Sequence, residues 1–364
     1  MEIVWESRWI AGFRDDMRNT VASAVSIQSG RFGAICGYVW NAERAFGGVE
    51  AIQHFRARGH EIPRYSRRPR EKKMTKTDSN TLYVSDLDGT LLRDDAVLSA
   101  RSFAILSRLL RDGMPFTVAS ARSVVSMQQV LGDLPLALPV IEFNGAFLTD
   151  YNTGKHLVVN AIDSGLCAEI LVSLRCSGVE PFVSAFDGEM DCLYHERIVN
   201  EGMLGYLNSR IDSNDRRVRD PIRLDQCLGH KVVCFTIIDG EKRLVDLRCE
   251  LEERYGERLV FHLYQDPYSG WHWLTMHDRR STKDQAIRWM QSMFGLDEHS
   301  LTVFGDHIND IRMFQIADTA VAVSNAQPSV MPYASEMIGS NMEDSVAEYL
   351  EREYVKAGGK LSNQ

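Results

Sequence analysis

Long apolar runs are absent from this sequence of 364 residues. The longest, Val232–Ile238, has seven residues, far fewer than the about 20 that a membrane-spanning helix needs. We therefore expect no membrane partner. Internal repeats and low-complexity tracts are also missing. Hydrophobic residues make up 44% and charged residues 25% of the chain, which is typical of a folded globular protein and not of a disordered or fibrous one.

Cysteine motifs and excess positive charge are scarce as well. The seven cysteines are odd in number and form no CxxC pair, so the sequence indicates neither a zinc site nor a complete disulfide framework. A cytoplasmic location fits such cysteine usage, and the first residues show no signal-peptide pattern. The net charge of −9 gives nucleic acid no general electrostatic attraction, so we expect no nucleic-acid partner. The oligomeric state cannot be read from the sequence.

Residues 1–73 differ in charge from the rest of the chain. They hold 13 basic and 8 acidic side chains and end in RYSRRPREKK, whereas the remaining residues are strongly acidic. They show no sustained helical or alternating periodicity. We interpret this segment as a poorly ordered extension, or as sequence translated from an upstream start codon. The alternative is that its basic run forms an interaction arm.

From Thr81 onward, short apolar strands alternate with amphipathic helices. Strands are expected at LYVSDLDG, MPFTVAS and LPVIEFNG, and again near the other end at LTVFGD and TAVAV. Helices are expected over residues 102–110 and 309–316. This alternation predicts an α/β fold whose parallel sheet is covered by helices on both faces.

A long segment, residues 148–273, interrupts this alternation. Within it we expect a helix over 164–175, a hairpin of FVSAF and MDCLYHE, a strand at VVCFTIIDG, a helix over 243–255, and strands at RLVFHLYQ and GWHWLTMH. This order predicts an α+β insertion. We therefore expect a catalytic core made of residues 74–147 and 274–364, with residues 148–273 as an inserted cap domain.

The first strand ends in DLDGTLL, which places Asp86 and Asp88 at the carboxyl edge of the sheet. Ligands of open α/β folds bind at this edge. Gly89 and Thr90 follow, in a turn where backbone N–H groups can approach an anion. An Asp-Gly turn alone is common after strands and is weak evidence.

Three further signals stand in matching structural contexts. A strand ends in Ser120, Lys283 begins an amphipathic helix, and LTVFGDHINDIRMF places Asp306, Asn309 and Asp310 where a strand passes into a helix. In this order and spacing, the motifs resemble those of the haloacid dehalogenase superfamily, specifically its Cof-like phosphatases. The resemblance covers residue 81 to about residue 350 and implies a Rossmann-like core.

The resemblance also implies roles for these residues. Asp86 would attack the phosphorus and form an aspartyl phosphate, while Asp88 would act as general acid and then general base. The dehalogenases of the superfamily lack this second Asp, so its presence favours phosphoryl chemistry. Ser120 and Lys283 would bind the oxygens of the transferring phosphoryl group.

Clustered carboxylates repel one another and require a cation. All-oxygen ligands and a phosphate substrate favour Mg²⁺. By resemblance, the carboxylates of Asp86 and Asp306 and the backbone carbonyl of Asp88 bind it, with Asp310 bound directly or through water. Asn309 would orient Asp310 or contact the phosphate.

Other residues leave two interpretations open. Arg122 either faces the phosphate or pairs with a surface carboxylate, and Asn144 either faces the substrate or caps a turn. An aromatic cluster near the end of the insertion either lines the substrate pocket or packs within the cap; its members are Tyr268, Trp271, His272 and Trp273.

The position of the insertion indicates the subclass. It lies between Ser120 and Lys283, as in the Cof-like subgroup, whose caps select small phosphorylated molecules. The sequence therefore predicts a Mg²⁺-dependent phosphatase acting on a small phosphorylated metabolite, such as a sugar phosphate or a phosphorylated cofactor. The alternatives are a sugar phosphomutase of the same superfamily and a catalytically silent ligand-binding protein.

Overall fold

The protein is described here from a computed structural model, which covers residues 80–266 and 269–359. The predictions for residues 1–73 and for Tyr268 lie outside the described residues.

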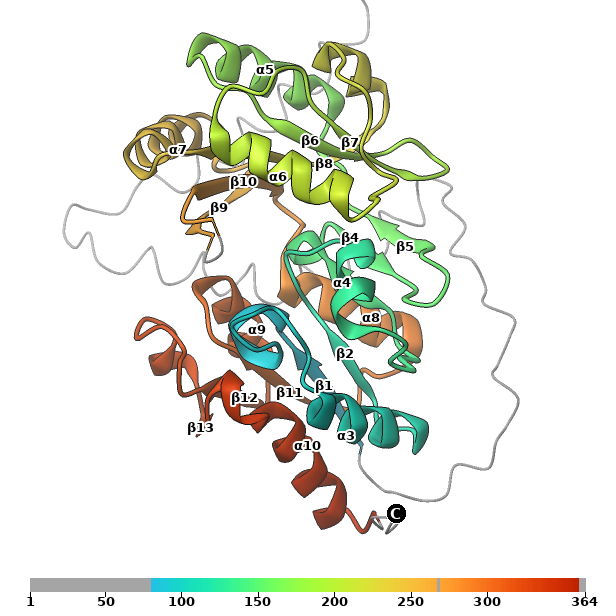
Figure 1. Cartoon of the computed structure of the whole chain (residues 1–364). Coiled ribbons are helices and arrows are strands. Elements are labelled where there is room, and N and C mark those ends of the chain that lie inside the picture. Colours follow the sequence, from blue (N-terminus) through green and yellow to red (C-terminus); the bar gives the residue numbers. More distant parts are fainter. Residues whose placement is uncertain (1–79, 267–268, 360–364) are drawn as a thin grey trace, which may run out of the picture. The chain divides into compact units, whose positions relative to one another are not determined.

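The first sheet consists of five parallel strands in the order β13-β12-β11-β1-β2 (Figure 1). These strands are β1 (Thr81–Ser85), β2 (Phe116–Val118), β11 (Ser300–Gly305), β12 (Thr319–Val323) and β13 (Glu336–Ile338). The helices that alternate with them in sequence are α3 (Ala100–Arg111), α4 (Val124–Leu131), α8 (Lys283–Phe294), α9 (Ile311–Ile316) and α10 (Ser345–Lys356). The α/β fold with a parallel sheet is confirmed.

Local sequence explains where these helices begin. Ser99 precedes α3 and its side chain accepts a hydrogen bond from the backbone N–H of Ser102. Ser123 does the same for α4 by accepting from the N–H of Ser126. Such caps satisfy N–H groups that have no partner inside the helix. The buried faces of α3, α8 and α10 share one apolar cluster with β1, β2, β11 and β12.

A smaller antiparallel sheet follows the second strand of the core. Its strands are β3 (Val140–Glu142), β4 (Phe147–Thr149) and β5 (His156–Val159), paired in that order. A short turn between β3 and β4 contains Asn144 with a φ of +56°. The small sheet thus places this turn beside residues that come from distant parts of the sequence.

A second five-stranded sheet, with the order β7-β6-β8-β10-β9, is antiparallel. Its strands are β6 (Phe182–Phe186), β7 (Asp191–Tyr194), β8 (Lys231–Asp239), β9 (Leu259–Gln265) and β10 (His272–Asp278). Three helices accompany it: α5 (Ser164–Cys176), α6 (Glu201–Asp212) and α7 (Glu241–Tyr255). The predicted pairing of β6 with β7 is confirmed, and β9 also pairs with β10. We call this sheet the cap sheet.

Two large apolar clusters lie on different sheets. One contains residues of the parallel sheet and reaches Tyr151 before it resumes at Ala286. The other begins at Ile162 and ends at Met276, and it joins the cap sheet to α5 and α7. The division into core and cap at residues 148 and 273 stays a prediction.

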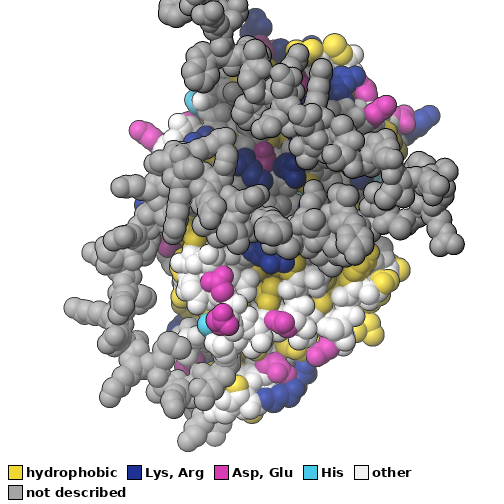
Figure 2. Space-filling model, turned by 180° about the vertical axis from the view of Figure 1, so that it is seen from behind, with side chains coloured by type: hydrophobic (Ala, Val, Ile, Leu, Met, Phe, Trp, Pro, Cys, Tyr) yellow, Lys and Arg dark blue, Asp and Glu magenta, His cyan; other side chains and the backbone are white. Residues whose placement is uncertain are grey.

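The surface and the helices carry two further observations. Among the described residues, no helix combines the length and the apolar character needed to cross a bilayer. On the described part of the face in Figure 2, acidic and basic side chains are interspersed among apolar and neutral ones.

Candidate active site

Asp86 lies directly after β1, at the carboxyl edge of the parallel sheet. Strands β11 and β2 flank β1 on its two sides, and the N–H of Asp86 donates to the carbonyl of Phe304 at 2.9 Å. The Asp86 residue is only 5% exposed. Burial raises the pKa of Asp86 well above its ordinary range. The charge of Lys283 opposes this rise, and Asp310 and Asp306 add to it.

The turn after Asp86 fits closely against Asp306. Gly89 has a φ of +77°, and a Cβ at this position would lie 2.5 Å from Oδ2 of Asp306. A side chain here would be strained and would displace that carboxylate. The Thr90 hydroxyl donates to Oδ1 of Asp306 at 2.7 Å. The Gly-Thr pair, predicted as an anion-binding turn, therefore also holds one of the acidic residues.

Asp310 is tied to the backbone where β11 ends. Its Oδ2 accepts hydrogen bonds from the N–H groups of Asp306 and His307, each at 3.0 Å. A Cβ on Gly305 would lie 2.7 Å from the Asp310 side chain, so only glycine leaves room there. The GDxxND spacing thus places the Asp310 side chain against the backbone of Gly305, Asp306 and His307.

Lys283 connects the acidic residues. It begins α8 and is 1% exposed, and its Nζ donates to Oδ1 of Asp86 at 2.5 Å and to Oδ1 of Asp310 at 2.7 Å. Burial alone would lower the pKa of Lys283, but the charges of Asp310 and Asp86 raise it above its ordinary value. The lysine is therefore held charged between two buried carboxylates.

Three carboxylates form a group that fits a metal ion. One oxygen each of Asp86, Asp306 and Asp310 lies within 4.8 Å of the others. Burial, and then the charge of Asp310, raises the pKa of Asp306 to about 7. One lysine does not balance three carboxylates, and an all-oxygen donor set suits a hard divalent cation. The residues present therefore fit a divalent metal. The Asp88 side chain is not part of this group.

Asp88 instead pairs with Arg122. The guanidinium donates from Nε to Oδ2 of Asp88 at 2.8 Å and from a terminal nitrogen to Oδ1 at 2.6 Å. The Asp88 side chain is 42% exposed. The hydroxyl of Ser120, a residue 1% exposed, accepts from the Arg122 N–H at 3.1 Å. Arg122 therefore forms an ion pair with another predicted site residue, Asp88.

Asn144 and Asn309 meet although 165 positions separate them. Nδ2 of Asn309 donates to Oδ1 of Asn144 at 3.1 Å. Asn144 adopts positive φ within its turn, so it is a turn residue that also contacts another predicted site residue. A Cβ on Gly145 would lie 2.5 Å from the carbonyl oxygen of Thr282. The turn is thereby fixed against the residue that precedes Lys283.

Several contacts were not predicted from the sequence. Nδ2 of Asn325 donates to the carbonyl of Gly89 at 2.7 Å, and no motif pointed to Asn325. In the predicted aromatic cluster, Trp271 and Trp273 pack against the apolar residues that α6 contributes to the cap. Their packing interpretation is therefore supported.

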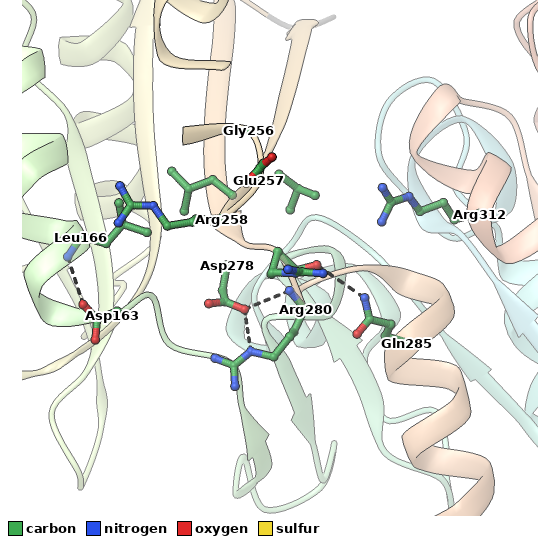
Figure 3. A pocket seen from close by; sticks show the side chains of 12 residues that line it. Asp163, Leu166, Gly256, Glu257, Arg258, Asp278, Arg280, Gln285 and Arg312 are labelled. Carbon is green, nitrogen blue, oxygen red and sulfur yellow. Dashed lines mark hydrogen bonds and ion pairs between the residues drawn. The ribbon is translucent and has the colours of Figure 1, made fainter. Parts of the chain in front are cut away.

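A groove of about 860 Å³ is lined by residues of α5, β9, β10, α8 and α9 and of the loops next to them (Figure 3). The charged residues that line the groove are Arg258, Arg279, Arg280, Arg312, Asp163, Asp278 and Glu257. Arg280 pairs with Asp278 at 2.6 Å and Arg258 with Glu169 at 2.8 Å. None of the predicted catalytic residues lines this groove.

Curated relatives share most of their length with this chain. It is 25% identical over 276 residues to a 5-amino-6-(5-phospho-D-ribitylamino)uracil phosphatase of Bacillus subtilis, which covers 75% of this chain and 97% of the relative. It is 23% identical over 269 residues to a pyridoxal phosphate phosphatase of Escherichia coli, which covers 73% of this chain and 95% of that protein.

Solved structures show the same fold. A Thermotoga maritima protein superposes with a TM-score of 0.62 at 25% identity, covering 75% of this chain and 97% of the other. A HAD/Cof-like hydrolase of Plasmodium vivax, described as putative, gives a TM-score of 0.60 at 18% identity, covering 77% and 100%. The sequence model of haloacid dehalogenase-like hydrolases matches residues 83–350. The chain therefore belongs to the haloacid dehalogenase-like hydrolases, in the Cof-like subgroup of phosphatases that hydrolyse phosphomonoesters.

Proposed function

We propose that this phosphatase is Mg²⁺-dependent and hydrolyses a small phosphomonoester through an aspartyl phosphate on Asp86. One observation carries the proposal: Asp86 lies in a buried carboxylate group with Lys283, while Asp88 stands outside that group with its side chain partly exposed. One carboxylate is thus placed with the cations that a phosphoryl group needs. The other is placed to exchange protons.

The chain's residues then divide the reaction between them. A carboxylate oxygen of Asp86 bonds to phosphorus as the bond to the leaving oxygen breaks, and Asp88 gives that oxygen a proton. Water next attacks the phosphorus, Asp88 takes the proton, and the bond from phosphorus to Asp86 breaks to release inorganic phosphate. Arg122 positions the Asp88 carboxylate by its paired hydrogen bonds.

The remaining predicted residues bind the phosphoryl group, hold loops of the site together or bind the metal in this proposal. Lys283 and Ser120 bind oxygens of the phosphoryl group, since Lys283 touches the nucleophile and Ser120 lies beside Arg122. Asn144 and Asn309 hold two site loops together. The carboxylates of Asp86 and Asp306 and the backbone carbonyl of Asp88 would hold the metal, with Asp310 bound directly or through water. When bound, Mg²⁺ supplies positive charge that offsets the repulsion between carboxylates and phosphate.

The substrate belongs to small phosphorylated metabolites in this proposal. The Bacillus subtilis and Escherichia coli relatives are named as phosphatases of 5-amino-6-(5-phospho-D-ribitylamino)uracil and of pyridoxal phosphate. These two compounds, other phosphorylated cofactors and sugar phosphates are therefore the first to test. Residues 148–273 form the cap that selects among them. A cytoplasmic location is part of the proposal, since the six cysteines in the described part of the chain are free thiols.

The test is phosphate release from a panel of phosphorylated sugars, nucleotides and cofactors, with Mg²⁺ or with a chelator. We expect stoichiometric inorganic phosphate from at least one compound, lost on chelation and restored by Mg²⁺. Conversion of a sugar phosphate to its isomer without phosphate release would contradict hydrolysis and indicate a mutase.

A further inference from the structure

Glu142 is a buried acidic residue outside the motifs that carry the phosphoryl chemistry. It is the last residue of β3, and its exposed fraction is 0%. Glutamate is almost never fully buried unless it is paired, because a carboxylate in the protein interior is costly without hydrogen-bond donors or charges around it. The partners of Glu142 therefore show what this side chain does in the fold.

The end of β3 is bonded to the loop that leads into α4. Oε2 of Glu142 accepts a hydrogen bond from the N–H of Val124, the first residue of α4. The next residue, Phe143, donates its N–H to the carbonyl of Arg122 at 3.2 Å. The start of α4 and the backbone of Arg122 are thus both held by the end of β3, and Glu142 holds the helix start with its side chain.

The first turn of α4 in turn holds the side chain of Arg122. The guanidinium donates to the hydroxyl of Ser126 at 3.2 Å, and it donates twice to the carboxylate of Asp88. Movement of this turn would therefore move the guanidinium and the carboxylate that it holds. Catalysis by a positioned group is sensitive to such movement, since a misplacement of about 1 Å can cost about 100-fold in rate.

The second carboxylate oxygen of Glu142 is connected with the cap sheet. Oε1 accepts from the hydroxyl of Thr149 and lies 3.6 Å from Nδ1 of His156. Nε2 of His156 lies 2.8 Å from Oδ1 of Asp191, a residue of β7 at the edge of the cap sheet. The His156 side chain is 5% exposed, so little water competes for these contacts. Polar contacts thus run from the cap sheet through His156 to Glu142.

Aromatic packing fixes the ring of His156 between two sheets. The imidazole stacks on Phe147 of β4, with ring centroids 4.0 Å apart and an angle of 6° between the planes. Phe186 of β6 contacts the edge of the same ring at a centroid distance of 5.0 Å. One aromatic partner therefore belongs to the small sheet and the other to the cap sheet (Figure 1). A close-packed ring of this kind holds one orientation.

We propose that Glu142 is a positioning residue for proton transfer, because it keeps Asp88 in place through Arg122. His156 and Asp191 connect this arrangement with the cap sheet. The inference rests on the proposed function, in which Asp88 gives the leaving oxygen its proton. A residue that only stabilised the fold would affect all substrates alike. A residue that positions the acid should matter most when the leaving group needs a proton.

The test compares p-nitrophenyl phosphate, whose leaving group needs little protonation, with the alkyl phosphate that the protein hydrolyses fastest. Glu142→Met removes both acceptor oxygens at similar length. We expect it to lower the alkyl-to-aryl ratio of kcat/KM about tenfold, a part of the about 10²- to 10⁴-fold that a general acid contributes. Glu142→Gln keeps an oxygen for the N–H of Val124 and should retain the wild-type ratio. Equal losses with both substrates in Glu142→Met would overturn the inference.

His156→Phe tests the connection with the cap sheet and is the second variant if Glu142→Met does not fold. It keeps the aromatic stack on Phe147 and removes both ring nitrogens. We expect the same ratio to fall about threefold, less than in Glu142→Met, because the bond from Glu142 to Val124 remains. His195→Phe is the matched control, since His195 is also buried, at 4% exposed, and follows β7. A ratio equal to that of the control would contradict the connection.

A double variant separates this inference from the proposed function. If Glu142 acts through Asp88, Glu142→Met should lower the alkyl-to-aryl ratio in the wild-type protein but not in Asp88→Asn, since both changes remove the same proton transfer. A ratio unchanged by Asp88→Asn itself would contradict the role of Asp88 in the proposed function. A ratio lowered by Asp88→Asn but not by Glu142→Met, or lowered further in the double variant, would contradict the inference alone.

Discussion

The carboxyl edge of the parallel sheet and the cap sheet differ in the side chains that they bury. At the edge, Lys283 pairs with Asp86 and Asp310, and backbone N–H groups hold Asp310 in place. On the face of the cap sheet that lies opposite α5 and α7, Ile238 and Trp273 pack with α6, and Oγ1 of Thr275 is buried without a hydrogen-bond partner among the described residues. Fixed charges suit the phosphoryl group that all substrates share. The cap sheet buries mainly apolar side chains on both of its faces.

The largest expected effect is a loss of activity on substitution of the first motif's two aspartates, and the loss should differ between them. Asp86→Asn should abolish phosphoryl transfer, because an amide is a very poor nucleophile. Asp88→Asn keeps the nucleophile and should lose about 10²- to 10⁴-fold in rate, less with an aryl phosphate, whose leaving group needs little protonation. Single-turnover formation of the phosphoenzyme is the measurement. Equal losses for aryl and sugar phosphates in Asp88→Asn would contradict its role as acid.

Removing the buried lysine should break the charge balance at the sheet edge. Lys283→Met leaves Asp86 and Asp310 buried without their cation, and losing one partner of a buried ion pair costs about 3–5 kcal/mol of folding stability. Urea unfolding in a chelator measures this loss, and Mg²⁺ should restore part of it. Lys242→Met, on the exposed surface of α7, is the control. Stability equal to the control would show that the lysine does not balance the carboxylates.

A buried glutamate at the end of β3, in the small three-stranded sheet, should make stability depend on pH. Burial raises the pKa of Glu142 from 4.5 to about 7, and His156 lies between Glu142 and Asp191 of β7, at 3.6 Å and 2.8 Å. The folded state holds this proton more tightly than the unfolded state. Glu142 therefore makes its full contribution to the free energy of unfolding below pH 4.5. This contribution, about 3 kcal/mol, is lost as the pH rises through 7.

Glu142→Gln stays neutral and removes this dependence. The difference in unfolding free energy between wild type and Glu142→Gln, measured by urea titration from pH 4 to 8, should change by that amount. The exposed Glu189→Gln serves as a control. Parallel curves for wild type and Glu142→Gln would show that Glu142 does not titrate in this range.

The smallest effect is expected outside both regions. Removal of residues 1–73, so that the chain begins at Met74, should leave solubility and phosphatase activity nearly unchanged, since every predicted catalytic residue follows Thr81. Thermal unfolding and kcat/KM are the measurements. An insoluble or inactive truncated protein would make the extension an integral element.

Much of the catalytic edge could be predicted, because topology constrains it. Parallel strands end at one edge, so the residues after β1 and β11 had to meet there, and the spacing of GDxxND places Asp306 and Asp310 together. Lys283 was predicted from its position at the start of α8. The pairing of Arg122 with Asp88, and that of Asn144 with Asn309, depended on the directions of loop side chains, which no periodicity encodes.

By itself, the sequence determined the α/β fold and most of its strands and helices, and it predicted the acidic residues and the lysine that the structure brings together at the sheet edge. These follow from local patterns of apolar residues and from motifs of fixed spacing. Only the tertiary structure decided which face of the cap sheet packs against α5 and α7 and which one packs against α6. Alternation gives each strand two faces, but the packing of helices that lie far away in the sequence chooses the face that is buried against apolar groups.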